Sequence, residues 1–215
     1  MTEITTAQAS VEEFLVALAA GDSTPGGGAA AALTGSQAAA LLSMVLNFTV
    51  GRKRYAEFEE ELQRCLKRTE RLRVELLSLA DKDAEAFGAV AACYAMPRST
   101  DAEKSARTTA MQVALRGAAE VPLAMADLCL EILKLTPPVA EKGNANVVSD
   151  AATAAHLAYA AMHSALVNVK VNLKFLKDAS YVAQGQAKVE SLENEAESCY
   201  AAARTSCKRT LGIAI

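Results

Sequence analysis

Residues Gly26–Gly51 read GGGAAAALTGSQAAALLSMVLNFTVG, and this stretch decides the fold. It carries no charge, because none occurs between Asp22 and Arg52. A helix without a polar face is either surrounded by other helices or lies in a membrane. Alanine is its commonest apolar residue, and the stretch contains Gln37 and Asn47 and lacks an interfacial aromatic belt. We therefore expect a central helix of a bundle rather than a membrane span.

A second uncharged stretch spans Ala151–Val169, directly after Ser149-Asp150, which is a good signal for a helix N-cap. In the first stretch, small side chains recur at every fourth position, which places them on one side of a helix. These residues are Gly28, Ala32, Ser36 and Ala40. Such a ridge allows a neighbouring backbone to approach closely, so both stretches are expected to be buried central helices.

The remaining segments also show helical periodicity, and no convincing strand pattern occurs. We expect a first helix that ends near Gly21, a long amphipathic segment over 54–96, a helix over 101–135 stopped by Pro137-Pro138, and a last helix over 190–211. As one helix the 54–96 segment is about 60 Å long. A compact monomer of this size is only about 45 Å across, so this helix bends near Gly88 or belongs to an elongated assembly. We predict a single all-α domain over residues 1–215, a bundle of about six helices.

Composition excludes several classes of protein. Hydrophobic residues make up 52% of the chain, which excludes disorder, and the net charge of -3 argues against nucleic acid. Five cysteines without a CxxC pair indicate reduced thiols. The start of the chain, Met1–Thr6, lacks the basic and apolar regions of a secretion signal. We expect a cytoplasmic protein with no membrane or nucleic-acid partner.

The long 54–96 segment carries a carboxylate in its apolar face. At about 100° per residue, Asp83 falls in the middle of the stripe, whereas Asp81, Lys82 and Glu85 point to the other side. The stripe consists of Leu62, Leu66, Thr69, Leu72, Leu76, Leu79, Phe87, Val90 and Tyr94. A buried carboxylate is costly unless it is paired, and burial perturbs its pKa as acid–base catalysis requires. Asp83 is therefore either a catalytic group or half of a structural ion pair or cap.

Two further elements are candidates for ligand binding. The turn Thr24–Gly28 opens a helix whose free N–H groups suit a carboxylate or carbonyl, although a tight turn alone explains it. No Gly-Lys-Ser/Thr follows, so it is not a phosphate-binding P-loop. Asn168 and Asn172 lie four residues apart on one helix, where they bridge helices or line a pocket.

The segment Gly143–Asp150 is predicted to be a loop with two amides and a carboxylate. Asn144, Asn146 and Asp150 together suit the edge of a heterocycle such as a pterin, and ordinary loop chemistry is the alternative. His156 and His163 are seven residues apart, too far for a zinc pair on one helix. We expect no metal.

These motifs occur together, and in this order, in one family. They are Pro25-Gly26-Gly27-Gly28, Gly51-Arg52-Lys53, Asp81-Lys82-Asp83-Ala84-Glu85-Ala86-Phe87, Pro97, Val121-Pro122-Leu123, Gly143-Asn144, Ser149-Asp150, and Asn168-Val169 to Asn172-Leu173. Over nearly its whole length the chain resembles the cyclodeaminase domain of bifunctional formiminotransferase–cyclodeaminases and the stand-alone methenyltetrahydrofolate cyclohydrolases. The resemblance implies an all-helical homodimer whose folate pockets are lined by the central helices, with Asp83 as the catalytic acid.

The formiminotransferase part is absent from this sequence, which favours hydrolysis of 5,10-methenyltetrahydrofolate to 10-formyltetrahydrofolate. Cyclodeamination of 5-formiminotetrahydrofolate is the alternative, and a non-catalytic folate-binding helical protein is a second one. The folate is the substrate, and no metal or redox cofactor is expected. The expected folate-binding residues are Pro25, Gly26, Gly27, Gly28, Arg52 and Lys53 for the benzoylglutamate, and Asn144, Asn146, Asp150, Asn168 and Asn172 for the pterin.

Overall fold

The computed structural model describes residues 5–213, and these form six α-helices and two short 3-10 helices without any strand. The α-helices are α1 (Val11–Ala19), α2 (Gly27–Asn47), α3 (Glu59–Ala95), α4 (Asp101–Lys142), α5 (Val148–Lys174) and α6 (Ala179–Leu211). The 3-10 helices are Lys53–Phe58 and Ala145–Val147. The expected all-α fold is confirmed. Of the segment inspected for a secretion signal, the first four residues lie outside the described range.

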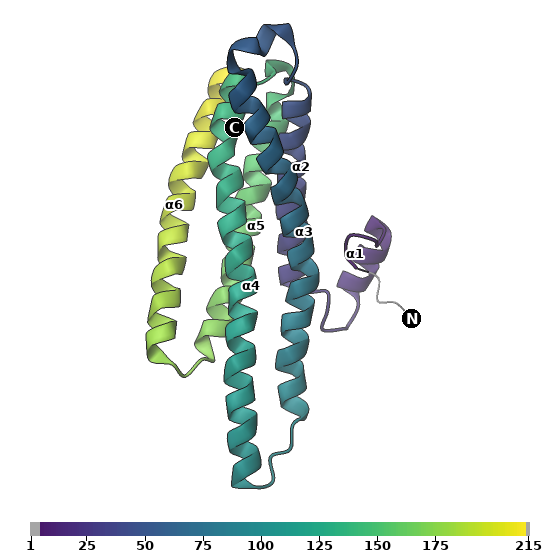
Figure 1. Ribbon diagram of the computed structural model, residues 1–215, viewed down its shortest axis with the longest axis vertical. Helices are drawn as coiled ribbons and strands as arrows, with labels where there is room; N and C mark the ends of the chain where they lie inside the picture. The colour runs from purple at the N-terminus through teal and green to yellow at the C-terminus, as the bar shows by residue number, and fades with distance from the viewer. Residues whose placement is uncertain (1–4, 214–215) are drawn as a thin grey trace.

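Helices α2 to α5 form an elongated bundle, and α6 packs along α4 and α5 (Figure 1). Helix α3 runs unbroken through Gly88, and α3 and α4 extend beyond the ends of the other helices (Figure 1). Helix α1 stands beside α3, apart from the bundle (Figure 1). The long helix therefore continues without a break at Gly88, and the chain itself is elongated rather than compact (Figure 1). All five cysteines are free thiols, as expected.

Small side chains of α2 let it approach α3 and α4 closely. A β-carbon on Gly35 would lie 2.8 Å from the Cys129 sulfur. Ser36 Oγ donates a hydrogen bond to the Arg73 carbonyl at 2.9 Å, and Ser43 Oγ donates to Thr69 at 2.8 Å. By length and composition α2 is the one helix in residues 5–213 apolar enough to cross a membrane, with a mean hydropathy of 1.5. Only 61% of the apolar 18-residue stretch within α2 is buried, so α2 is a core helix with one uncovered side.

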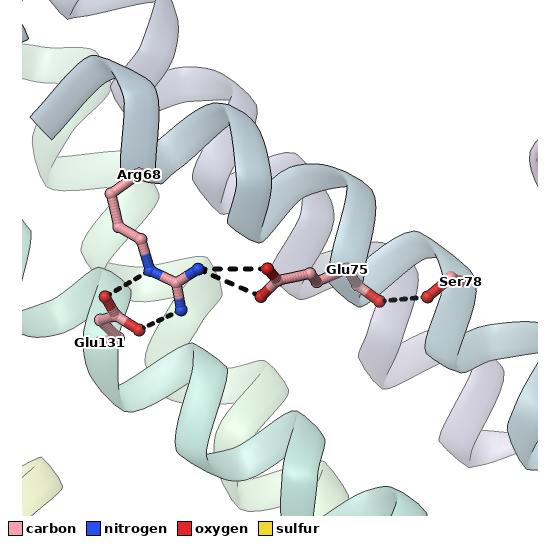
Figure 2. A network of polar contacts seen from close by, with 4 residues as sticks. All are labelled: Arg68, Glu75, Ser78 and Glu131. Atoms are coloured by element: carbon pink, nitrogen blue, oxygen red, sulfur yellow. Dashed lines mark hydrogen bonds and ion pairs between the residues drawn. The ribbon is translucent and has the colours of Figure 1, made fainter. Parts of the chain in front are cut away.

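A charged network clamps α3 to α4 (Figure 2). The Arg68 guanidinium donates to both oxygens of Glu131, at 2.6 and 2.5 Å, and to both oxygens of Glu75 at 3.2 Å. Ser78 Oγ donates to the Glu75 carbonyl within α3. The hydrogen bonds that Arg68 donates to Glu131, with the charge of both carboxylates, raise the pKa of Arg68. Because Arg68 belongs to α3 and Glu131 to α4, this bidentate pair fixes the relative position of the two helices.

The expectation that Pro137-Pro138 stops its helix is wrong, because α4 continues to Lys142. Each proline removes one backbone donor. Val139 and Ala140 beyond them are fully buried, and Thr210 of α6 donates a hydrogen bond to the Ala140 carbonyl at 3.0 Å. Tertiary packing therefore outweighs the local helix-breaking preference.

The N-cap expected at Ser149-Asp150 is also displaced. Helix α5 begins at Val148, so both residues lie in its first turn. The side chain of Asn144 accepts a hydrogen bond from the Asn146 N–H at 3.1 Å and caps the preceding 3-10 helix instead. Helix α5 itself therefore begins without a side-chain cap.

Candidate active site

The Asp83 carboxylate lies against the first turn of α2. A β-carbon on Gly28 would meet its two oxygens at 2.2 and 2.4 Å, so glycine alone leaves room for the acid. Because α2 begins at Gly27, the first N–H groups of the helix have no partner within the helix. The acid is therefore held at the positive end of the central helix.

Asp83 has no protein partner in residues 5–213: it accepts no hydrogen bond and forms no ion pair there. Leu79 and Val90, on the same face of α3, are buried at 8% and 7% exposure. Burial raises the pKa of the Asp83 carboxyl. The predicted position in the apolar face is thus observed, and the ion-pair alternative is not. A carboxyl group in this state can exchange a proton with a ligand.

The apolar stripe itself is shorter than predicted. Phe87 is 43% exposed and Tyr94 is 68% exposed, although both fall on the predicted face. In Figure 1 the end of α3 extends beyond the start of α2, so fewer helices cover it there. Asp83 therefore lies near the level at which the four-helix core gives way to the α3–α4 extension.

The two predicted asparagines of α5 lie at this end of α2 and have different partners. Asn168 Nδ2 lies 3.8 Å from the position of a β-carbon on Gly27 and donates to the Ser164 carbonyl. Asn172 Nδ2 donates to the carbonyls of Ala118 and Asn168, at 2.9 and 3.0 Å. Asn172 therefore ties α5 to α4, whereas the Asn168 side-chain oxygen has no partner in the described residues.

Pro25 precedes the glycines and lines a cleft of about 670 Å³ between the N-terminal segment and α3. The Thr24–Pro25 peptide bond is cis. Asp81 also lines this cleft, where its Oδ1 accepts hydrogen bonds from Thr6 N and Oγ1 at 2.8 and 2.7 Å. Sequence reasoning placed Asp81 away from the core but missed this contact. No periodic pattern connects residues so far apart in the chain.

The other predicted site residues lie at the opposite end of α2. Asn144 N–H donates to Thr49 Oγ1 at 2.9 Å, and Asn144 Nδ2 donates to the Phe48 carbonyl at 3.4 Å. These bonds fix the 143–150 loop to the C-terminal end of α2. The helix between residues 28 and 47 is about 28 Å long, more than a side chain can span. The glycine turn and this loop therefore lie at opposite ends of α2 within one chain.

The structure thus divides the predicted residues into two groups. The aspartate end consists of Pro25, Gly26, Gly27, Gly28, Asp83, Asn168 and Asn172. The arginine end consists of Arg52, Lys53, Asn144, Asn146 and Asp150. The two groups are separate because they lie at opposite ends of α2.

The arginine end has a groove of about 400 Å³ between α2 and α3. Phe48, 49% exposed, and Arg52 line it. Arg73 also lines it, donates to Glu70 at 2.8 Å and lowers the pKa of that carboxyl. The Arg52 side chain, by contrast, has no hydrogen bond or ion pair in residues 5–213. The groove therefore combines an exposed aromatic ring with an unengaged cation.

The family model described as formiminotransferase-cyclodeaminase matches residues 10–191. The chain belongs to this family. A methenyltetrahydrofolate cyclohydrolase of Methylorubrum extorquens is 46% identical over 187 residues, which cover 87% of this chain and 90% of the relative. The formimidoyltransferase-cyclodeaminase of Rattus norvegicus is 32% identical over 88% of this chain but only 35% of its own length. This member of the formiminotransferase-cyclodeaminase family therefore matches nearly all of the cyclohydrolase but only about a third of the formimidoyltransferase-cyclodeaminase.

A solved structure supports the same membership. Formiminotetrahydrofolate cyclodeaminase from Thermotoga maritima matches with a TM-score of 0.83 and 34% identity. The match covers 96% of this chain and 97% of that one. The family fold is therefore shared over almost the whole length, including both ends of α2.

Proposed function

We propose that this protein is an enzyme that hydrolyses 5,10-methenyltetrahydrofolate to 10-formyltetrahydrofolate, with Asp83 as the group that transfers protons. The observation that carries the proposal is an unpaired carboxyl group, its pKa raised by burial, at the first turn of the central helix. The 46% identity to a cyclohydrolase over most of both chains supports the choice of substrate.

The reaction begins when water adds to the methenyl carbon between N5 and N10 and Asp83 takes one of its protons. The positive charge on that N–C–N unit disappears as the tetrahedral carbon forms. Asp83 then returns the proton to N5 while the bond from carbon to N5 breaks. The hydroxyl group loses its proton to solvent as the N10-formyl group forms. A carboxylate beside the cationic carbon stabilises it, and a raised pKa brings the acid closer to the operating pH.

Four residues around Asp83 have roles in binding the substrate or in positioning a residue that binds it. The free N–H groups of Gly27 and Gly28 are donors at the reaction site. The free side-chain oxygen of Asn168 is an acceptor for a pterin N–H. Asn172, whose amide group donates to two backbone carbonyls, is a positioning residue for Asn168. Arg52 or Lys53 binds the anionic glutamate, with Asn144, Asn146 and Asp150 as further polar contacts.

The protein is proposed to act as a cytoplasmic homodimer, without a membrane or nucleic-acid partner. The substrate supplies the reacting carbon, and the proposed steps require no metal or redox cofactor. Ala-rich surface on α2 that its own chain leaves uncovered supports the dimer.

Cyclodeamination is the second candidate function, and the match to a formiminotetrahydrofolate cyclodeaminase favours it. In that reaction N10 adds to the formimino carbon and ammonia leaves, which gives the methenyl compound. The same carbon is bonded to N5 and N10 in both reactions, and Asp83 protonates the departing amine.

The test is to incubate purified protein separately with each folate and follow the methenyl chromophore. Loss of the chromophore faster than in buffer identifies the cyclohydrolase, and its appearance from the formimino compound identifies the cyclodeaminase. A folate that raises the melting temperature without turnover identifies a non-catalytic binder. Asp83→Asn is the control for reaction catalysed by a contaminant.

A further inference from the structure

The segment that precedes α2 is attached to the bundle at two points and stands away from it in between. At its start, Thr6 donates hydrogen bonds from N and Oγ1 to Asp81 Oδ1 of α3, at 2.8 and 2.7 Å. At its end it continues directly into Gly26, the N-cap of α2. Between these points α1 stands beside α3 and packs closely along none of the other described helices (Figure 1). We call residues 5–25 the N-terminal strap.

Helix α1 buries only a small part of its own apolar face. Val11, Phe14, Leu15 and Leu18 fall at the spacing that places side chains on one face of a helix. Phe14 is 7% exposed, but Val11 is 75% exposed and Leu15 is 55% exposed. In its present position α1 therefore leaves apolar surface in water that a closer approach to the bundle would bury.

The wall of α3 that faces the strap across the cleft of about 670 Å³ is also apolar and open. Phe87, Gly88 and Ala91 line it from α3, whereas Phe14 and Ala17 line it from α1. Phe87 is 43% exposed, and nothing lies within 4 Å of an added β-carbon on Gly88. Two apolar walls that face each other across an open cleft favour closure, because contact removes both of them from water.

The inner end of this cleft adjoins the candidate active site. Pro25 and Ala29 line it from the start of α2, and Ala84 lines it from α3. These residues flank Gly28 and Asp83 in the sequence, and the Asp83 carboxylate lies against Gly28. The strap leads without interruption into the glycine turn that makes room for the acid. A movement of the strap is therefore transmitted to the backbone around Asp83.

We infer that the N-terminal strap is a lid that closes over the cleft beside Asp83 when the folate binds, with the contact between Thr6 and Asp81 as its anchor. Residues 20–24, which join α1 to the glycine turn, are all exposed and serve as the hinge. Because both ends are held, α1 moves about the line that joins them, toward α3 or away from it. Closed, the strap keeps solvent from one side of the acid and slows the departure of the folate. This inference rests on the proposed folate substrate.

The anchor is tested by three substitutions. Thr6→Val keeps the shape of the side chain and removes the Oγ1 donor, and it should raise KM by about 3–10-fold with a smaller change in kcat, because one hydrogen bond of the anchor is lost. Thr6→Ser retains the donor and should restore the wild-type KM. Thr5→Val is the matched control, since the Thr5 hydroxyl has no hydrogen bond in residues 5–213. Equal KM values for Thr6→Val and Thr5→Val overturn the role of the anchor.

Hydrogen exchange of the α1 amides, followed by mass spectrometry, measures closure directly. Tetrahydrofolate is the probe, because it has no one-carbon group to lose. At saturation it should slow exchange of the α1 amides at least about tenfold, and by less in Thr6→Val. The amides of residues 190–200 in α6 are the internal control and should not change. Tetrahydrofolate that raises the melting temperature but leaves exchange in α1 unaltered overturns the inference.

A cross-link tests closure without any folate. Ala17→Cys combined with Ala91→Cys places one thiol on each wall of the cleft, and mild oxidation should join them as the strap closes. Val16→Cys combined with Ala91→Cys is the matched control, because Val16 is 67% exposed on the far side of α1, and it should not cross-link. If the wild type neither binds nor turns over a folate, the proposed function fails and this pair alone decides whether the strap closes. If the wild type is active but the exchange and the cross-link show no closure, the function stands and the lid does not.

Discussion

The Asp83 carboxylate occupies the space that a side chain on Gly28 would fill. A β-carbon there would meet the carboxyl carbon at 2.4 Å. The glycine turn therefore does more than begin a helix: it lets an acid from α3 approach the first turn of α2. This single contact joins two motifs that are far apart in the sequence. The side chain at position 28 therefore determines where the Asp83 carboxylate can lie.

Gly28→Ala should displace the carboxylate and lower kcat by at least about tenfold, because a small misplacement of a catalytic group is costly. Stability should change by less than about 1 kcal/mol, since the short acid can rotate away and alanine favours the helix. Gly117→Ala is the control, because nothing lies within 4 Å of its added β-carbon. It should keep full activity. Steady-state kinetics and a denaturant melt measure both quantities, and normal activity of Gly28→Ala would contradict the role of this contact.

Asp83→Asn keeps the shape of the side chain and removes its acid–base function. Turnover should fall by about 10²–10⁴-fold, the usual contribution of a positioned general acid or base. Stability should hold or rise, because a buried charge without a partner is replaced by a neutral amide. A structural ion pair would instead lose about 3–5 kcal/mol. If Asp83→Asn were destabilised but its remaining folded fraction turned over normally, the catalytic assignment would be wrong.

The two control variants for Asp83→Asn, on the same helix, are not equally informative. Glu85→Gln changes an exposed carboxylate of the same helix and should leave both turnover and stability unaltered. From the helical wheel alone, Asp81→Asn is also expected to leave turnover and stability unaltered. Asp81, however, accepts two hydrogen bonds from Thr6. It should therefore loosen the N-terminal segment, and only Glu85→Gln is a neutral reference.

The raised pKa of Asp83 predicts two effects of pH. Because the folded chain holds this proton more tightly than the unfolded chain, Asp83 stabilises the fold at low pH and loses that contribution as pH rises through its folded pKa. The free energy of unfolding relative to Asp83→Asn should fall over that window. Activity, which needs the ionised form, should rise over the same window in kcat/KM. A kcat/KM profile that falls on the acid side at the pKa of an ordinary aspartate, with no change in the stability relative to Asp83→Asn, would contradict both predicted effects of pH.

Sequence patterns predicted the helices and the place of Asp83 because both depend on local periodicity. The wheel put Asp83 in the apolar stripe between Leu79 and Phe87. In the structure Leu79 is buried, whereas Phe87 is 43% exposed. The end of α4 was mispredicted because Pro137-Pro138 act locally, whereas the burial of Val139 depends on helices distant in the chain.

The candidate site was predictable in its residues but not in its arrangement. Gly28 and Asn144 were both singled out, yet helical periodicity does not say which ends of two helices meet. That follows from the order and direction in which the helices pack. The antiparallel packing of α2 with both α3 and α5 places Asp83 and Asn168 together and sends Asn144 to the far end.

The Arg68 network predicts a stability effect separate from catalysis (Figure 2). Arg68→Ala should cost about 1–3 kcal/mol, because it strands two carboxylates around a guanidinium that is 30% exposed. Arg64→Ala removes an exposed pair with Glu60 and should cost less than about 0.5 kcal/mol. Urea melts compare the two. Equal small losses would show that the network does not hold α3 to α4, and kcat should be unchanged in both.

The last prediction links assembly to activity through Val167, an exposed apolar residue of α5, the helix that packs beside α2. Val167→Asp places an unpaired charge in the proposed homodimer interface and should turn the dimer into a monomer at micromolar concentration. Light scattering coupled to size exclusion measures this. If turnover depends on the dimer, kcat/KM should fall with the loss of the dimer and recover in part at higher protein concentration.

Val113→Asp is the matched control, since Val113 of α4 is 68% exposed and belongs to neither α2 nor α5. It should remain dimeric and active. A wild-type protein that is monomeric at micromolar concentration would contradict the homodimer directly. A monomeric Val167→Asp with full activity would show that turnover does not depend on the dimer.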